Sequence, residues 1–216
     1  WRAIPTFEGV IDGRNHKLEN FAVIAVTGSN GITDIMSLFE TNNGTIKNLT
    51  INISDKKISY NGTTDGVNVA TVAINNNGTI DNVNVTGTIE VLPVGRGGYN
   101  ITTLAGGLVI NNSKTATITN SSATGMNISA LDDMDDFVSV GGIATNNNGI
   151  ITNTYFDGFL LSNRVGGITA KNAGLIDRCY VTDNTTHFKC KFTNLDDEYL
   201  DVLENSQIHF AKKENK

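Results

Sequence analysis

The chain has 216 residues, a formal net charge of −6, 18% charged residues and 39% hydrophobic residues, so it has enough apolar surface for a core and is not a disordered polyelectrolyte. No run of basic residues is longer than the two of Lys212-Lys213. The sequence therefore has no basic patch of the kind that binds nucleic acid or an anionic membrane. No stretch approaches the roughly 20 apolar residues of a membrane span, so we expect no membrane insertion.

Asparagine, threonine and glycine dominate the composition. They number 29, 26 and 22 and together make up over a third of the chain. These residues favour turns and strands over helices. The chain opens at Trp1 without a Met or a leader and closes in the polar tail 212–216, so we expect a piece of a larger protein.

One ten-residue phrase recurs along the chain after a weaker forerunner. The copies read NHKLENFAV at 15–23, NNGTIKNLTI at 42–51, NNGTIDNVNV at 76–85, KTATITNSSA at 114–123, NNGIITNTYF at 147–156 and NAGLIDRCYV at 172–181. Upstream, Gly142 and Gly167 each stand nine residues before the anchor isoleucine of their copy. The spacing of residues within a copy is fixed, whereas the distance from one copy to the next varies. This pattern indicates a scaffold of stacked repeats that carries loops of variable length.

In each copy apolar and polar residues alternate as they do in a β-strand, and then this alternation shifts by one residue. The residue at the slip is asparagine in five copies and arginine in the last: Asn20, Asn48, Asn82, Asn120, Asn153 and Arg178. Asparagine tolerates the left-handed conformation that a sharp bend requires. Stacked at about 4.8 Å, its side-chain amides can also form a hydrogen-bonded ladder.

Short strands, two bends and a loop in each copy predict an all-β fold, a parallel β-helix of about six coils over residues 1–190. The predicted inward columns are Leu18/Ile46/Ile80/Ile118/Ile151/Ile176, Phe21/Leu49/Val83/Ser121/Thr154/Cys179 and Val23/Ile51/Val85/Ala123/Phe156/Val181. The alternative is an antiparallel sandwich, but a sandwich gives no reason for asparagine to occur in five copies at the position where the alternation shifts. Residues 191–216 form the predicted cap of the open end, with a short helix that places Leu195, Tyr199, Val202 and Leu203 on one face.

The phrase GGI, then N-x-G-x-I, then C-Y-V at 166–181 resembles the GLUG-type repeat of bacterial surface proteins, and the opening FEGVIDG at 7–13 looks like the start of such arrays. The resemblance covers about residues 7–183. Members include adhesin-like wall proteins and the non-catalytic N-terminal region of immunoglobulin A-cleaving zinc metalloproteases. The resemblance implies a secreted or surface protein, located outside the cell or in its wall, with a β-helical stalk or binding module and no assigned catalytic residue.

The residues offer no enzyme centre. The histidines are His16, His187 and His209, with no HExxH pair, and no nucleophile–base constellation can be assembled. We therefore expect no catalysis and no cofactor in this segment. A polysaccharide-active β-helix enzyme is the third choice of function, because Arg96 and Arg164 follow equivalent strands and could share a flank with acidic residues.

Two features leave alternatives open. The acidic cluster Asp132, Asp133, Asp135 and Asp136 could bind calcium, but it lacks the ordered spacing of calcium loops, so a solvated acidic loop is favoured. Cys179 and Cys190 would face each other if residues 183–186 form a hairpin loop, which would allow a disulfide. Two buried thiols are the slightly preferred alternative.

The variable loops are the predicted ligand contacts of an adhesive module, with a host glycan or extracellular protein as partner. The candidate residues are Tyr60, Arg96, Tyr99, Asp132, Asp133, Asp135, Asp136 and Arg164. The loop aromatics could stack on sugar rings or equally pack down onto the coil. The alternative function is an accessory or spacer domain of a large secreted protease. In both cases we expect a monomer.

Overall fold

A computed structural model describes residues 1–53, 57–60, 66–92, 102–131 and 138–182. Within these residues every regular element is a β-strand, and no helix is long and apolar enough to cross a membrane. The all-β prediction is confirmed. The predicted C-terminal helix and the cap segment 191–216 lie outside the described residues.

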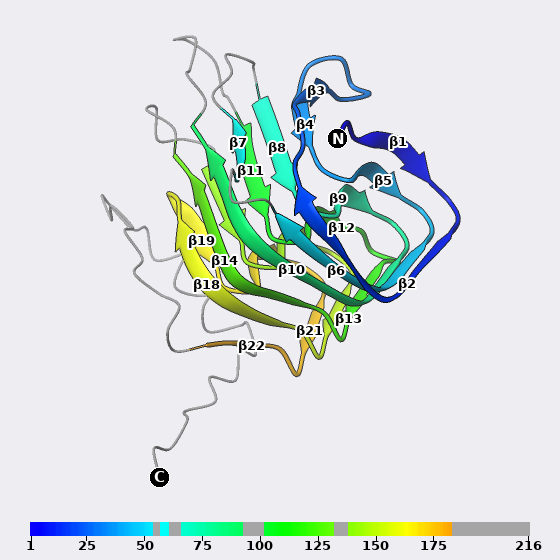
Figure 1. Ribbon diagram of the computed structural model, residues 1–216. Coiled ribbons are helices and arrows are strands. Elements are labelled where there is room, and N and C mark those ends of the chain that lie inside the picture. The colour runs from blue at the N-terminus through cyan, green and yellow to red at the C-terminus, as the bar shows by residue number, and fades with distance from the viewer. Residues whose placement is uncertain (54–56, 61–65, 93–101, 132–137, 183–216) are drawn as a thin grey trace.

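The strands form three sheets that wind as a β-solenoid, with equivalent strands of successive copies side by side (Figure 1). Sheet A contains β1 (Ile4–Phe7), β5 (Phe39–Asn42), β9 (Ala73–Asn76), β12 (Val109–Asn112), β16 (Ala144–Asn147) and β20 (Thr169–Asn172). Sheet B contains β2 (Val10–Phe21), β6 (Thr45–Ile53), β7 (Ile58–Tyr60), β10 (Thr79–Val91), β13 (Thr117–Thr119), β14 (Ser122–Ala130), β17 (Ile150–Thr152), β18 (Tyr155–Leu161), β21 (Leu175–Asp177) and β22 (Tyr180–Val181).

Sheet C contains β3 (Val26–Thr27), β4 (Asp34–Met36), β8 (Gly66–Ala70), β11 (Thr102–Gly106), β15 (Val138–Gly141) and β19 (Arg164–Gly166). Among the described strands only β3 and β4 pair antiparallel, while the repeat strands pair parallel throughout. Parallel pairing between copies excludes the antiparallel sandwich, because a sandwich joins sequential strands in opposite directions.

The described residues form a solenoid of about four turns, and the six coils that the repeat count predicted are not confirmed. The first copy contributes β1 and β2 but no parallel strand to sheet C, where β3 instead forms a hairpin with β4. In the last copy β21 has three residues and β22 has two. The two end copies are therefore partial, and the middle four carry the stack.

The predicted inward columns hold for the second to sixth copies. Ile80 pairs in register with Ile46 and Ile118, and the same column continues through Ile151 to Ile176. The side chains of the first four of these isoleucines are fully buried. Each such burial contributes roughly 1.5–3 kcal/mol, so the stacked columns are the main source of cohesion between turns.

The first copy is aligned differently from the prediction. Ile11, not Leu18, pairs with Ile46, and Leu18 pairs with Ile51 in place of Val23. The cause is a longer bend: Asp12 pairs with Lys47 and His16 with Leu49, so three residues, 13–15, oppose the single Asn48. Arg14 and Asn15 take φ values of 47° and 62° to make this bend.

The bend predicted at the phase slip is confirmed. Asn48, Asn82, Asn120, Asn153 and Arg178 all have φ between 49° and 54°, which is the left-handed region. Asn20 also has a positive φ of 57°, although it does not stack with the others.

The Gly-Gly phrase marks the tight corner between sheets C and A. A Cβ on Gly142 would lie 2.0 Å from the Gly167 oxygen and 2.6 Å from the Phe156 ring. A Cβ on Gly141 would lie 1.8 Å from the Ala144 oxygen. The two glycines are therefore required by close backbone approach and by the interior ring, not by a positive φ.

Candidate binding surfaces

A buried asparagine ladder fixes the corner that follows sheet A. The last residue of five sheet A strands is asparagine, and each side chain donates from Nδ2 to Oδ1 of the next: Asn42 to Asn76 (2.8 Å), Asn76 to Asn112 (2.9 Å), Asn112 to Asn147 (2.8 Å) and Asn147 to Asn172 (2.8 Å). Because a buried amide must be hydrogen-bonded, this ladder holds the turns in register. It also makes the adjoining outer surface of sheet A rigid.

A second, outward-facing row of amides lies one residue before the buried ladder, and we call it the amide comb. It consists of Asn75, Asn111 and Asn146, and Lys171 continues the same column on β20. Asn111 Nδ2 donates to Asn75 Oδ1 at 2.9 Å, and Asn146 Nδ2 donates to Asn111 Oδ1 at 2.9 Å. The Oδ1 atom of Asn146, at the Lys171 end, accepts no hydrogen bond in the described structure.

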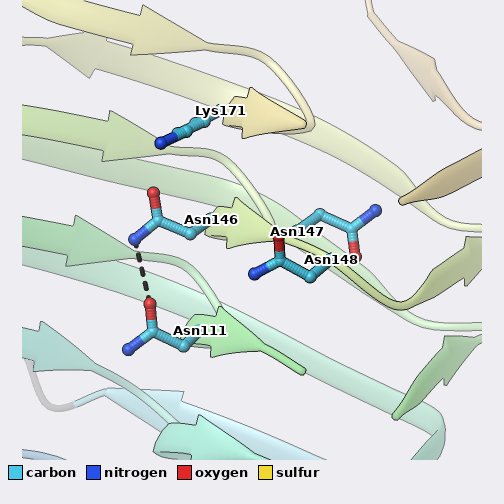
Figure 2. Close-up of a pocket in the computed structure, with 5 residues that line it drawn as sticks. All are labelled: Asn111, Asn146, Asn147, Asn148 and Lys171. Atoms are coloured by element: carbon cyan, nitrogen blue, oxygen red, sulfur yellow. Dashed lines mark hydrogen bonds between the residues drawn. The ribbon is translucent and has the colours of Figure 1, made fainter. Parts of the chain in front are cut away.

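The comb borders a hollow lined by Asn111, Asn146, Asn147, Asn148 and Lys171. Figure 2 shows Lys171, Asn146 and Asn111 extending in the same direction from successive strands, with Asn147 and Asn148 to one side. Lys171 and Asn148 are exposed, and within the described part of the chain neither side chain is hydrogen-bonded or ion-paired. The described lining contains no carboxylate, so the hollow is polar with one positive charge.

A different surface is formed where sheet B strands end and sheet C strands begin, and we call it the connection edge (Figure 1). Val91 of β10 pairs with Ala130 of β14, and Thr103 of β11 pairs with Val138 of β15. Connections from successive turns therefore leave and re-enter the sheets at one edge. They occupy residues 61–65, 92–101, 131–137 and 162–163.

Two leucines at the base of these connections expose apolar side chains. Leu92 is 43% exposed and Leu131 is 38% exposed. They directly follow the neighbouring strands β10 and β14, and Leu131 N donates to Val91 O at 3.1 Å. The connection edge thus offers apolar contact area where β10 and β14 end.

Of the predicted contact residues, the structure describes Tyr60 and Arg164. Tyr60 is 5% exposed and its hydroxyl donates to Asp34 Oδ2 at 3.0 Å. It cannot stack on a sugar ring, because its pairing with Val91 turns the ring into the core. Arg164 is exposed at the start of β19, on the same edge but in a different turn from Tyr60. Arg96, Tyr99, Asp132, Asp133, Asp135 and Asp136 lie outside the described residues.

Cys179 is a buried free thiol, and its Sγ lies 3.4 Å from the Asp177 oxygen and 3.5 Å from the Ile151 oxygen. Burial raises the pKa of this thiol. Cys190 lies outside the described residues, as does the acidic cluster that was considered for calcium. Among the described residues no three His, Cys, Asp or Glu side chains are grouped to hold a metal ion.

The hollow was not predicted from the sequence. Its signal is the repeated Asn-Asn pair at 75–76, 111–112 and 146–147, where the first residue faces out and the second faces in. Lys171 enters the set solely through the register of β20.

Comparison with protein-family models, curated proteins and solved structures found no match for this chain. The resemblance to the GLUG-type repeat therefore stays a prediction made from the residues.

Proposed function

We propose that this chain is a non-catalytic binding module of a secreted or cell-wall protein, and that the connection edge meets its ligand, a host glycan or extracellular protein. The observation that carries the proposal is a difference in connection length on one scaffold. β18 and β19 are joined by two residues, Ser162 and Asn163, whereas β10 and β11 are joined by residues 92–101. Closing a turn does not need the longer segments.

Extra length that the fold does not require is the usual location of binding residues, because a rigid scaffold can position variable segments without losing stability. Leu92 and Leu131 add apolar area at the same edge. Two further predicted features belong to this proposal: about six coils, and a C-terminal helix that caps the stack. The cap would cover an open sheet edge, which would otherwise pair with other chains.

The test is an array of extracellular glycans and immobilised host proteins, probed with the full chain and with a variant in which residues 93–101 are replaced by Ser-Asn, the connection used between β18 and β19. We expect the full chain to bind at least one probe, and the variant to lose that binding while its thermal unfolding stays cooperative. Binding that survives replacement of 93–101 and, separately, of 132–137 would overturn the assignment to this edge. An array without any hit would favour the accessory or spacer domain instead.

A further inference from the structure

We propose that the hollow beside the amide comb is a second binding site, separate from the connection edge, and that its ligand is an acidic oligosaccharide, a chain of sugars that carries carboxylates. The two surfaces do not share residues: the hollow lies at the end of the sheet A strands, and the connection edge lies between sheets B and C. The hydrogen-bonding groups of the hollow that lack a partner among the described residues indicate the chemistry of this ligand.

Within the comb, most acceptors are satisfied and several donors are not. The Oδ1 atoms of Asn75 and Asn111 each accept a hydrogen bond from the next amide. The amide nitrogens of Asn111 and Asn146 each have two N–H groups and donate one of them along the comb, so one remains on each. The Lys171 ammonium adds three donors, and the Asn148 carboxamide adds two donors and an acceptor. The open groups are therefore mainly donors.

An excess of donors with one positive charge selects a ligand rich in acceptors that carries negative charge. A carboxylate offers acceptors only and forms a charge-assisted bond with an ammonium. Sugar hydroxyls both donate and accept, so they also suit the free Oδ1 atoms of Asn146 and Asn148. A polyphosphate or nucleic acid is disfavoured, because it needs several basic residues and the chain has a net charge of −6 with one ammonium in the hollow.

The comb is ordered before any ligand arrives. Its hydrogen bonds fix the amide planes, and the buried ladder one residue further on holds the strands that carry them. Preorganised groups bind without a large ordering cost. Four strands at about 4.8 Å spacing make a comb of roughly 14 Å, which suits an extended ligand better than a single small ion.

The experiment uses the full, isotopically labelled chain and follows the side-chain amide signals of Asn111, Asn146 and Asn148 by NMR. The probes are a galacturonate tetrasaccharide, a galactose tetrasaccharide as its neutral match, sodium acetate and inorganic phosphate. We expect shifts with the acidic tetrasaccharide at concentrations where the other three give none. Lys171→Gln should weaken its binding about three- to fivefold, the scale of an exposed charge pair, and Lys17→Gln, an exposed lysine on β2, should leave it unchanged.

Binding should also weaken in 1 M salt, where the screening length falls to about 3 Å. Equal binding of the neutral tetrasaccharide would overturn the role of Lys171. Equal binding of acetate or phosphate would reduce the site to a simple anion site and overturn the oligosaccharide assignment. Absence of any shift would overturn the whole proposal. Repeating the titration with residues 93–101 replaced by Ser-Asn separates this site from the connection edge, because only the latter should be affected.

Discussion

Asn76 donates from its side-chain Nδ2 to Oδ1 of Asn112 at 2.9 Å, and both residues are fully buried. All four bonds of this inner ladder run toward the C-terminal end of the stack. The bonds between outward-facing asparagines run the other way: Asn82 donates to Asn48, and Asn146 donates to Asn111. Each buried amide thus depends on the turn after it, so neighbouring turns are coupled by polar groups as well as by apolar packing.

Replacing one amide of the inner ladder should therefore cost more than replacing its exposed neighbour. Asn112→Ala removes the acceptor of the shorter hydrogen bond from Asn76 Nδ2, which keeps a bond of 3.4 Å to the Gly78 oxygen, and one of the two hydrogen bonds to Asn147 Oδ1, which keeps the Gly149 N–H. We expect a loss of about 1–3 kcal/mol in the free energy of unfolding, the cost of removing a partner from a buried polar group. Asn111→Ala removes comb bonds at a part-buried position and should cost less than about 1 kcal/mol. Urea unfolding of both variants measures the difference, and equal losses would contradict the coupling.

The bends and the inward columns could be predicted because each depends on local spacing. Asn82 at the phase slip follows from strand alternation and from the tolerance of asparagine for positive φ. The alignment of the first copy could not be predicted in this way. Leu18 has the same chemical character as Ile11, and only the pairing of Ile11 with Ile46 reveals that residues 13–15 form a longer bend.

The hollow was beyond sequence reasoning for a different reason. Asn75 and Asn76 are the same residue type, and their opposite orientations arise from the corner between sheets A and B. Lys171 joins Asn146 only because β20 pairs with β16 in that register. For Tyr60 the sequence left two positions open, stacking on a sugar or packing onto the coil, and the buried ring on β7 shows the second.

The left-handed bend can be tested at Asn153, which is exposed and has a φ of 49°. Asn153→Gly should change stability little, because glycine adopts this conformation freely. Asn153→Val should be less stable than the glycine variant by about 1–2 kcal/mol, the cost of holding a side-chain-bearing residue in the left-handed region. Thermal unfolding monitored by circular dichroism compares them. A valine variant as stable as the glycine variant would show that the bend relaxes when φ is changed.

The corner glycine at 142 should not tolerate even one methyl group. Gly142→Ala places Cβ 2.0 Å from the Gly167 oxygen and 2.6 Å from the buried Phe156 ring. We expect a loss of about 3 kcal/mol or failure to fold, since neither the backbone nor the ring can move away easily. Gly9→Ala is the control, because its Cβ would lie 3.5 Å from the Phe7 ring. The prediction is wrong if both variants give the same urea midpoint.

Asp12 should titrate below its ordinary range. Its Oδ1 accepts hydrogen bonds from Asn48 Nδ2 and from the Arg14 backbone N–H, both at 3.0 Å, and these bonds lower the pKa of the carboxyl group, the Asn48 bond most. A lowered pKa contributes stability above the unfolded-state pKa, and this contribution is lost as pH falls through the folded-state pKa. Carboxyl-detected NMR titration should show the pKa rising in Asn48→Ala and rising less in Lys47→Gln, whose ammonium is 3.7 Å away. An unchanged pKa in Asn48→Ala would contradict the assignment.

The buried thiol of Cys179 should react slowly in the folded chain. Burial raises its pKa, which lowers the fraction of thiolate, and the thiolate is the reactive form. The raised pKa also makes stability depend on pH. The contribution of this thiol to the free energy of unfolding is fully present below the unfolded-state pKa and is lost as pH rises through the raised folded-state pKa. In a Cys190→Ser background Cys179 is the single cysteine of the chain. A disulfide reagent at pH 8 should label it many times faster in urea than in buffer, and Cys179→Ser should remove the signal. Rapid labelling in buffer would show that the last turn opens readily, because Cys179 lies in the inward column directly after Thr154.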